Sequence, residues 1–192
     1  MRVSREEMEK SHKRIVEGAA RLVRDRGIES TSVDDVMSEA GLTHGGFYRH
    51  FKTKDALVAA ALQSAFEQLT AALEARFEKY EPKVAVANYH ADYLSNMHVE
   101  EPGIGCPLAA LGGDVARGSD ALKIAFGAGV NRLVGTLARG MEGSPQERRA
   151  KAGRELAMLV GAVVIARASD PETAHSVLAA CRTDPTLELP IP

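Results

Sequence analysis

The chain has 192 residues, of which 45% are hydrophobic and 26% charged, with a formal net charge of −2 at pH 7. This length and composition fit one or two small soluble domains and exclude a disordered or fibrous chain. No apolar stretch approaches the ~18 residues of a membrane span, and two cysteines are too few for a disulfide framework or zinc site. Aromatic residues are only 5% and Trp is absent. We therefore expect an all-α, cytoplasmic protein with no metal, cofactor or membrane partner.

The first elements predict a helix followed by a turn and a second, shorter helix. The first helix is expected over residues 9–26, with Gly27 ending it. Ser32 suits an N-cap, and Asp35 can reach back to its amide as in a capping box. Gly41 then suits the left-handed position that ends a helix. Between Ser32 and Gly41, apolar residues recur at helical spacing: Val33, Val36, Met37 and Ala40.

The segment from Thr43 to Phe51 predicts a third helix that faces solvent. Thr43 can cap it, while Phe47 and Phe51, one turn apart, would face inward. Its outward side would carry two glycines, each costing roughly 1 kcal/mol relative to alanine in a helix. Close approach of the helix backbone to a DNA groove would offset that cost. The pair of short helices therefore predicts a helix-turn-helix whose second helix enters the major groove.

A long fourth helix, capped by Thr53 and running to about Tyr80, is expected to join a head at residues 1–54 to a body at residues 55–192. The head carries a net charge of +2 and the body −4, which favours a local DNA-contacting face. The body is expected to consist of helices at residues 83–98, 107–117, 119–141, 146–168 and from Pro171 to about Arg182.

The head resembles the DNA-binding segment of the tetracycline-repressor (TetR) family. The resemblance is carried by Val36, Ala40-Gly41-Leu42, the run from Gly45 to Phe51, and Lys54 with Leu57, and it extends back over residues 14–33. It implies a ligand-responsive transcriptional regulator, in most cases a repressor. Such a protein binds a palindromic double-stranded DNA operator as a homodimer and is released by a small-molecule effector.

The resemblance and the helix geometry together give the predicted DNA-contacting residues. Arg49 could pair with a guanine edge or a phosphate, whereas the positions of Tyr48, His50 and Lys54 resemble phosphate-holding positions of the family. The full set is Thr31, Ser32, Thr43, His44, Gly45, Gly46, Tyr48, Arg49, His50 and Lys54.

The body is expected to hold an effector pocket and a dimer interface, and ordinary intrachain core is the alternative for both. Few charges are expected inside it, which favours a small neutral or apolar effector. The expected pocket residues are Tyr89, Tyr93, Met97, His98, Cys106 and Phe126. The expected interface lies on two apolar helices and comprises Phe126, Val130, Leu133, Leu137, Leu156, Val160, Val163 and Val164.

Cys106 supports two further hypotheses. It precedes Pro107 at a predicted helix N-terminus, where the helix dipole favours a thiolate that could sense oxidants or electrophiles; a small buried side chain is the alternative. Cys106 with His98 or His90 could also suggest an enzyme nucleophile, and His90, Asp92 and His98 a metal site, but neither has the spacing of a known motif. A constitutive DNA-organising protein is a third class, disfavoured by the weakly basic head.

Overall fold

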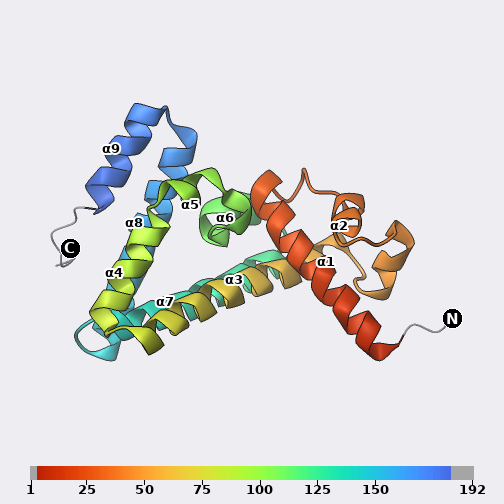
Figure 1. The fold of residues 1–192 in the computed structure, drawn as a ribbon, viewed down its shortest axis with the longest axis horizontal. Helices are drawn as coiled ribbons and strands as arrows, with labels where there is room; N and C mark the ends of the chain where they lie inside the picture. Colours follow the sequence, from red (N-terminus) through yellow and green to blue (C-terminus); the bar gives the residue numbers. More distant parts are fainter. Residues whose placement is uncertain (1–3, 183–192) are drawn as a thin grey trace.

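A computed structural model describes residues 4–182, and all regular elements within this range are helices, as predicted. Parts of the predicted head and body, residues 1–3 and 183–192, lie outside the described residues. Figure 1 shows α1 and α2 at one end, α8 and α9 at the other, and the long α3 running between them beside α7. The elements are α1 (Arg5–Arg26), α2 (Val33–Glu39), η1 (His44–Arg49), α3 (Lys54–Lys79), α4 (Pro82–Tyr93), α5 (Asn96–Glu100), η2 (Pro102–Ile104), α6 (Pro107–Arg117), α7 (Asp120–Leu137), η3 (Ala138–Gly140), α8 (Pro145–Ala168) and α9 (Pro171–Arg182).

Helix boundaries in the head follow local chemistry. Helix α1 begins four residues earlier than predicted, because the Ser4 hydroxyl accepts the amide of Glu7 as an N-cap. It ends at Gly27, whose φ of +87° suits glycine, and Gly41 has a φ of +67° after α2. The capping box at the start of α2 is confirmed, with both of its reciprocal hydrogen bonds present.

The third element differs from its prediction. The segment after Thr43 forms a six-residue 3-10 helix, η1, instead of an α-helix. Gly45 and Gly46 are poor helix formers, and 3-10 geometry is used mainly in such short pieces. Phe47 and Phe51 nevertheless pack together as expected, with ring centroids 6.1 Å apart, and both are buried. Tertiary packing of these two rings therefore holds a segment that is too short and too rich in glycine to form a stable α-helix alone.

Helix α3 serves the cores of both the head and the body. The Thr53 hydroxyl accepts the amide of Ala56 at 3.1 Å, which confirms the predicted cap. Leu57 and Ala61 pack in the head core, whereas Leu73 packs in the core of the body. Serving two cores makes the helix apolar along its length. It meets the length and composition of a membrane span, with a mean hydropathy of 1.3 over 18 residues, which corrects the expectation that no stretch comes close. Packing against α1 and α7 explains its apolar faces.

The predicted helix over residues 83–98 is broken in two. Helix α4 ends at Tyr93, and α5 begins after Ser95. The Ser95 hydroxyl donates to the carbonyl of Asp92 at 2.7 Å and accepts the amide of His98 at 3.3 Å. Such local hydrogen bonds compete with helix continuation. The break changes the direction of the chain, so residues beyond Ser95 no longer continue the face that carries Tyr93.

Candidate nucleic-acid interface and regulatory region

The outer surface of η1 is anchored by one buried ring. Phe47 lies in the head core, 2% exposed, and its ring meets Tyr48 edge-on at 5.2 Å. Tyr48 is 70% exposed, and Thr43 and Arg49 are exposed as well. A Cβ built on Gly45 would meet nothing within 4 Å, so the fold itself leaves this position open. The result is an open stretch of helix backbone near an exposed aromatic and an exposed cationic side chain, a surface suited to the edge of a duplex.

Two residues predicted to touch DNA have their hydroxyl groups engaged elsewhere. Thr31 is 1% exposed and donates to the carbonyl of Gly27 at 2.8 Å, so the predicted contact from Thr31 is wrong. Ser32 is exposed, but its hydroxyl donates to the Asp35 carboxylate at 2.5 Å and accepts the Asp35 amide at 3.1 Å. The demands of the α1–α2 turn and the capping box explain why these residue types occur here.

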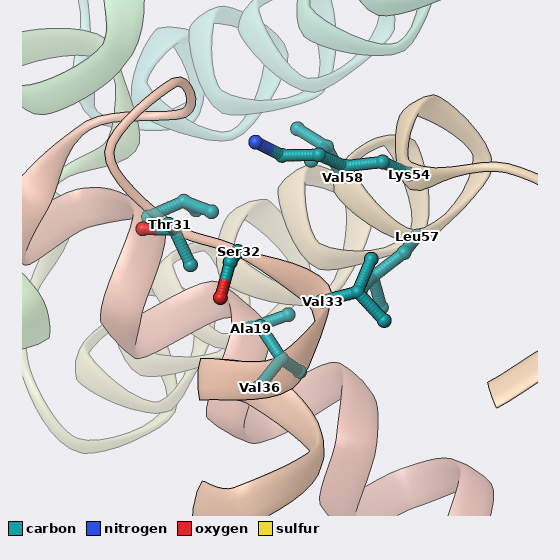
Figure 2. A pocket seen from close by; sticks show the side chains of 9 residues that line it. Ala19, Thr31, Ser32, Val33, Val36, Lys54, Leu57 and Val58 are labelled. Carbon is teal, nitrogen blue, oxygen red and sulfur yellow. The ribbon is translucent and has the colours of Figure 1, made fainter. Parts of the chain in front are cut away.

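Lys54 is placed at the edge of the head by the start of α3. Figure 2 shows it at the rim of a pocket, with Thr31 and Ser32 on one side and Leu57 on the same helix as Lys54. Its ammonium lies 3.5 Å from the carbonyl of Glu29. The side chain therefore extends towards the turn before α2. The rest of the pocket lining is apolar: Ala19, Val23, Val33, Val36 and Val58.

The predicted DNA-contacting surface also carries two histidines, His44 and His50, whose charge depends on pH. His44 Nδ1 lies 2.5 Å from Asp34 Oδ1, so a carboxylate competes with any phosphate for this side chain. His50 is half-buried, and partial burial, with smaller contributions from His12 and Arg49, lowers its pKa. The His12 and His50 rings lie 5.7 Å apart. A phosphate placed here would favour the protonated imidazole of His50.

Four of the six predicted pocket residues come together in the body. The Tyr89 and Tyr93 rings lie 5.6 Å apart, and the Tyr93 ring meets His98 edge-on at 4.4 Å. The Cys106 amide donates to His98 Nε2 at 2.9 Å. All four residues are buried. Burial raises the pKa of both tyrosines, which therefore remain neutral phenols.

The remaining two predicted pocket residues lie elsewhere. Met97 is 60% exposed, because the break before α5 turns it away from the α4 face. The Phe126 ring packs edge-on against Phe66 at 5.6 Å and belongs to a different apolar cluster, formed by residues of α1, α3, α6 and α7. Helical spacing in the sequence could not reveal that break.

The surroundings of Cys106 oppose the hypotheses of a reactive thiol. Burial raises its pKa and outweighs the opposing effects of the Tyr93 hydroxyl and the first amides of α6. The expected thiolate at a helix N-terminus is therefore corrected to a neutral thiol. His98 accepts the Cys106 amide through Nε2, the nitrogen that a catalytic dyad would direct at the sulfur.

The three residues of the suggested metal site have separate partners. His90 Nε2 lies 3.0 Å from Glu155 Oε1, Asp92 pairs with Arg76, and His98 bonds to the backbone. They do not converge on a common point.

The predicted dimer residues divide between core and surface. Four of them are buried within the chain and are corrected to intrachain core: Leu133, Leu137, Leu156 and Val163. Phe126 and Val130 lie on α7, which packs lengthwise against α3. On α8, in contrast, Val164 is 43% and Ile165 46% exposed. Gly153 and Gly161 on the same helix face open space, so the outer face of α8 is both apolar and uncovered.

The arrangement defines an all-α helix-turn-helix protein, with a small head joined through α3 to a larger helical body. Residues 15–61 match the family model described as bacterial regulatory proteins, tetR family. This match lies within α1, α2, η1 and the first turns of α3, so it concerns the head alone.

Known relatives match over about a third of this chain. The chain is similar to the HTH-type transcriptional regulator TtgR of Pseudomonas putida, with 37% identity over 67 residues, or 35% of this chain and 32% of TtgR. It is also similar to the uncharacterized HTH-type transcriptional regulator YerO of Bacillus subtilis, with 36% identity over 56 residues, or 29% of this chain and 19% of YerO. The matched segment thus spans a third or less of these relatives.

A solved structure extends the likeness to the whole fold. The reduced form of E. coli NemR superposes with a TM-score of 0.74 at 19% identity, covering 90% of this chain and 95% of NemR. The likeness concerns the arrangement of helices in both head and body.

Proposed function

We propose that the protein is a DNA-binding transcriptional regulator, acting as a repressor in the cytoplasm of a bacterium. The observation that carries the proposal is the outer surface of η1, where Tyr48 and Arg49 flank the open backbone of Gly45. The names of TtgR and YerO as HTH-type transcriptional regulators support it. The contacting set we propose is the predicted one without Thr31.

Selection of a duplex from a random-sequence pool tests this proposal, followed by affinity measurements by fluorescence anisotropy. Arg49→Ala should weaken binding by ~1–3 kcal/mol and relax sequence preference at one position if Arg49 reads a guanine edge. If it contacts phosphate instead, binding should weaken for all sequences and the salt dependence should lose about one unit of slope. Lys79→Ala, at the far exposed end of α3, is the matched control and should bind normally. Selection of no duplex, or equal losses in both variants, contradicts the proposal.

We propose that two copies pair through the outer face of α8, because one head contacts only part of an operator. Dimers of this class read half-sites ~34–36 Å apart, or multiples of that distance. Val160 and Val164 keep their predicted place in this interface, with Ile165 added. Val164→Glu should shift the protein to monomers in analytical ultracentrifugation. Ile124→Glu on α7, where the side chain is 73% exposed, should leave the dimer intact. Loss of the dimer in Ile124→Glu alone would place the interface on α7.

We propose that a small neutral effector binds beside Tyr89 and Tyr93. The Tyr89 hydroxyl and the Thr70 hydroxyl are buried and have no hydrogen-bond partner among residues 4–182. An unmade buried hydrogen bond costs ~1–3 kcal/mol, so a ligand that offers an acceptor is favoured. It would release DNA only if it bound the two head arrangements unequally.

Acetophenone and benzoate, similar in size but neutral and anionic, test this assignment in thermal-shift measurements. If acetophenone stabilises the protein and Tyr89→Phe abolishes this effect, the result supports a neutral ligand that accepts a hydrogen bond from Tyr89. Stabilisation by benzoate alone contradicts it.

A further inference from the structure

One peptide group forms a bridge between the head and the body, in addition to the hydrogen bond from the Ile28 amide to Asp114 Oδ2 at 2.9 Å. The carbonyl of Gly105 accepts Arg24 Nη1 of α1 at 2.9 Å, and the adjoining amide of Cys106 donates to His98 Nε2 at 2.9 Å. The C=O and N–H of a trans peptide point in opposite directions. This peptide therefore lies between a guanidinium of the head and an imidazole of the body, and its orientation satisfies both at once.

The imidazole is fixed in its turn by two helices of the body. His98 Nδ1 lies 2.6 Å from the carbonyl of Tyr93, and the Tyr93 ring packs against it edge-on. Arg167 of α8 donates to the carbonyls of His98 and Val99 at 2.7 and 3.1 Å. Because Nδ1 faces a carbonyl, it carries the proton, and Nε2 is left as an acceptor.

Residue types on both sides fit this link. A Cβ at Gly105 would lie 2.6 Å from the His98 ring, so only glycine allows the peptide to approach so closely. Arg24 is anchored to its own helix by Nε, which donates to the carbonyl of Ala20 at 2.8 Å. The guanidinium therefore transmits the position of the peptide directly to α1.

We propose that His98 is a positioning residue that holds the DNA-binding head against the body through the Gly105–Cys106 peptide and Arg24. Displacement of Tyr93 by an effector, or protonation of the imidazole, releases the link. The inference rests on the proposed function in that the head is taken to bind DNA and Tyr93 to border the effector site.

Protonation breaks the link because an imidazolium presents N–H to the amide of Cys106 instead of a lone pair. The titratable and charged groups that face His98 are Tyr93 from α4, Cys106 before α6 and Arg167 from α8. Burial lowers the pKa of His98 and Arg167 adds to this, while the hydrogen bond to the Tyr93 carbonyl opposes it. The link is therefore intact at neutral pH and opens only in acid.

Two substitutions separate the roles of the two ring nitrogens. His98→Gln places an amide oxygen near the position of Nε2, keeps an acceptor for Cys106 and does not titrate. His98→Asn keeps a donor for the Tyr93 carbonyl but is too short to reach Cys106. Arg24→Met removes the guanidinium and keeps an unbranched apolar stem. The first readout is the affinity for the duplex that this protein selects from a random pool. The second is the rate of hydrogen exchange between the Cys106 amide and solvent, measured by 15N NMR without DNA.

At pH 7.5, His98→Asn should speed exchange of the Cys106 amide and weaken DNA binding roughly 3- to 10-fold, the net effect of one hydrogen bond that preorganises the head. His98→Gln should stay near the wild type. Adding His98→Asn to Arg24→Met should cause no further loss, because both act through one peptide. Between pH 7.5 and 5, the DNA affinity of the wild type should fall more than that of His98→Gln. Both proteins carry the same histidines in the head, so titration of those histidines does not change the ratio of the two affinities.

Additive losses in the double variant, or unchanged exchange of the Cys106 amide in His98→Asn, would overturn the proposal. If His98→Asn fails to fold, the test is the DNA affinity of the wild type relative to His98→Gln between pH 7.5 and 5. A ratio that does not change with pH would overturn the proposal. If no duplex is selected, the proposed function fails, and NMR exchange in His98→Asn and His98→Gln still tests the link itself.

Discussion

The contact between α7 and α3 makes a sharp prediction at Gly129. A Cβ on this residue would lie 2.1 Å from Cδ2 and 2.3 Å from Cγ of Phe66. The Phe66 ring is fully buried and also packs against Phe126, so it cannot swing away freely. In a close-packed core, such overpacking costs ~1–3 kcal/mol. Gly129→Ala should therefore destabilise the protein, even though alanine is the better helix former.

Gly127 on the same helix provides the matched control, because a Cβ there would meet nothing within 4 Å. Gly127→Ala should stabilise the protein by ~0.8–1 kcal/mol from helix propensity alone. The same gain applies to Gly129→Ala and cancels in the comparison. The two variants should thus differ by ~1–3 kcal/mol in free energy of unfolding.

Urea and thermal denaturation measure this difference. In a chain of this size, 1 kcal/mol shifts Tm by ~2–4 °C, so the two variants should lie about 2–12 °C apart. Gly127→Ala should melt above the wild type. If Gly129→Ala is as stable as Gly127→Ala, the close approach of α7 to α3 at Phe66 is not real.

Two further predictions concern helix caps. Thr53→Ala should lower the free energy of unfolding by ~1 kcal/mol, because the Thr53 hydroxyl accepts an amide hydrogen bond at the start of α3. Ser119 makes no such bond at the start of α7, so Ser119→Ala should lower the free energy of unfolding by less in the same urea titration. The pKa of Asp170 lies below its ordinary value, because the carboxylate accepts hydrogen bonds from Thr173 and Glu172. The folded state then binds fewer protons than the unfolded state, so stability should fall as pH drops below ~4, and less steeply in Asp170→Asn; equal slopes would contradict this.

The sequence alone determined the features that depend on neighbours in the chain. Ser32 with Asp35, Thr53, Gly27 and Gly41 were all placed correctly, because caps and left-handed stops are satisfied within a few residues. The helix-turn-helix and the all-α fold followed from these signals and from the spacing of apolar residues.

Features that depend on distant partners could not be foreseen. The amide of Ile28 bonds to Asp114, 86 positions away, and Phe126 packs against Phe66 instead of joining the predicted pocket. Periodicity marks an apolar face but does not say what covers it. For that reason Leu133 and Val163, predicted at a dimer interface, lie in the intrachain core.

The link between head and body shows the same division most clearly. Arg24 and Gly105 are 81 positions apart, and the local sequence around neither residue indicates the other. Hydrogen-bond partners at such separations are chosen by the packing of whole helices. Thus the sequence by itself specified the caps of α2 and α3 and the glycine stops after α1 and α2, but not the start of α1 or the uncapped start of η1. Only the tertiary structure brought His98, one peptide group and Arg24 into a single line of contacts, because that alignment depends on how α1, α4 and α8 pack together.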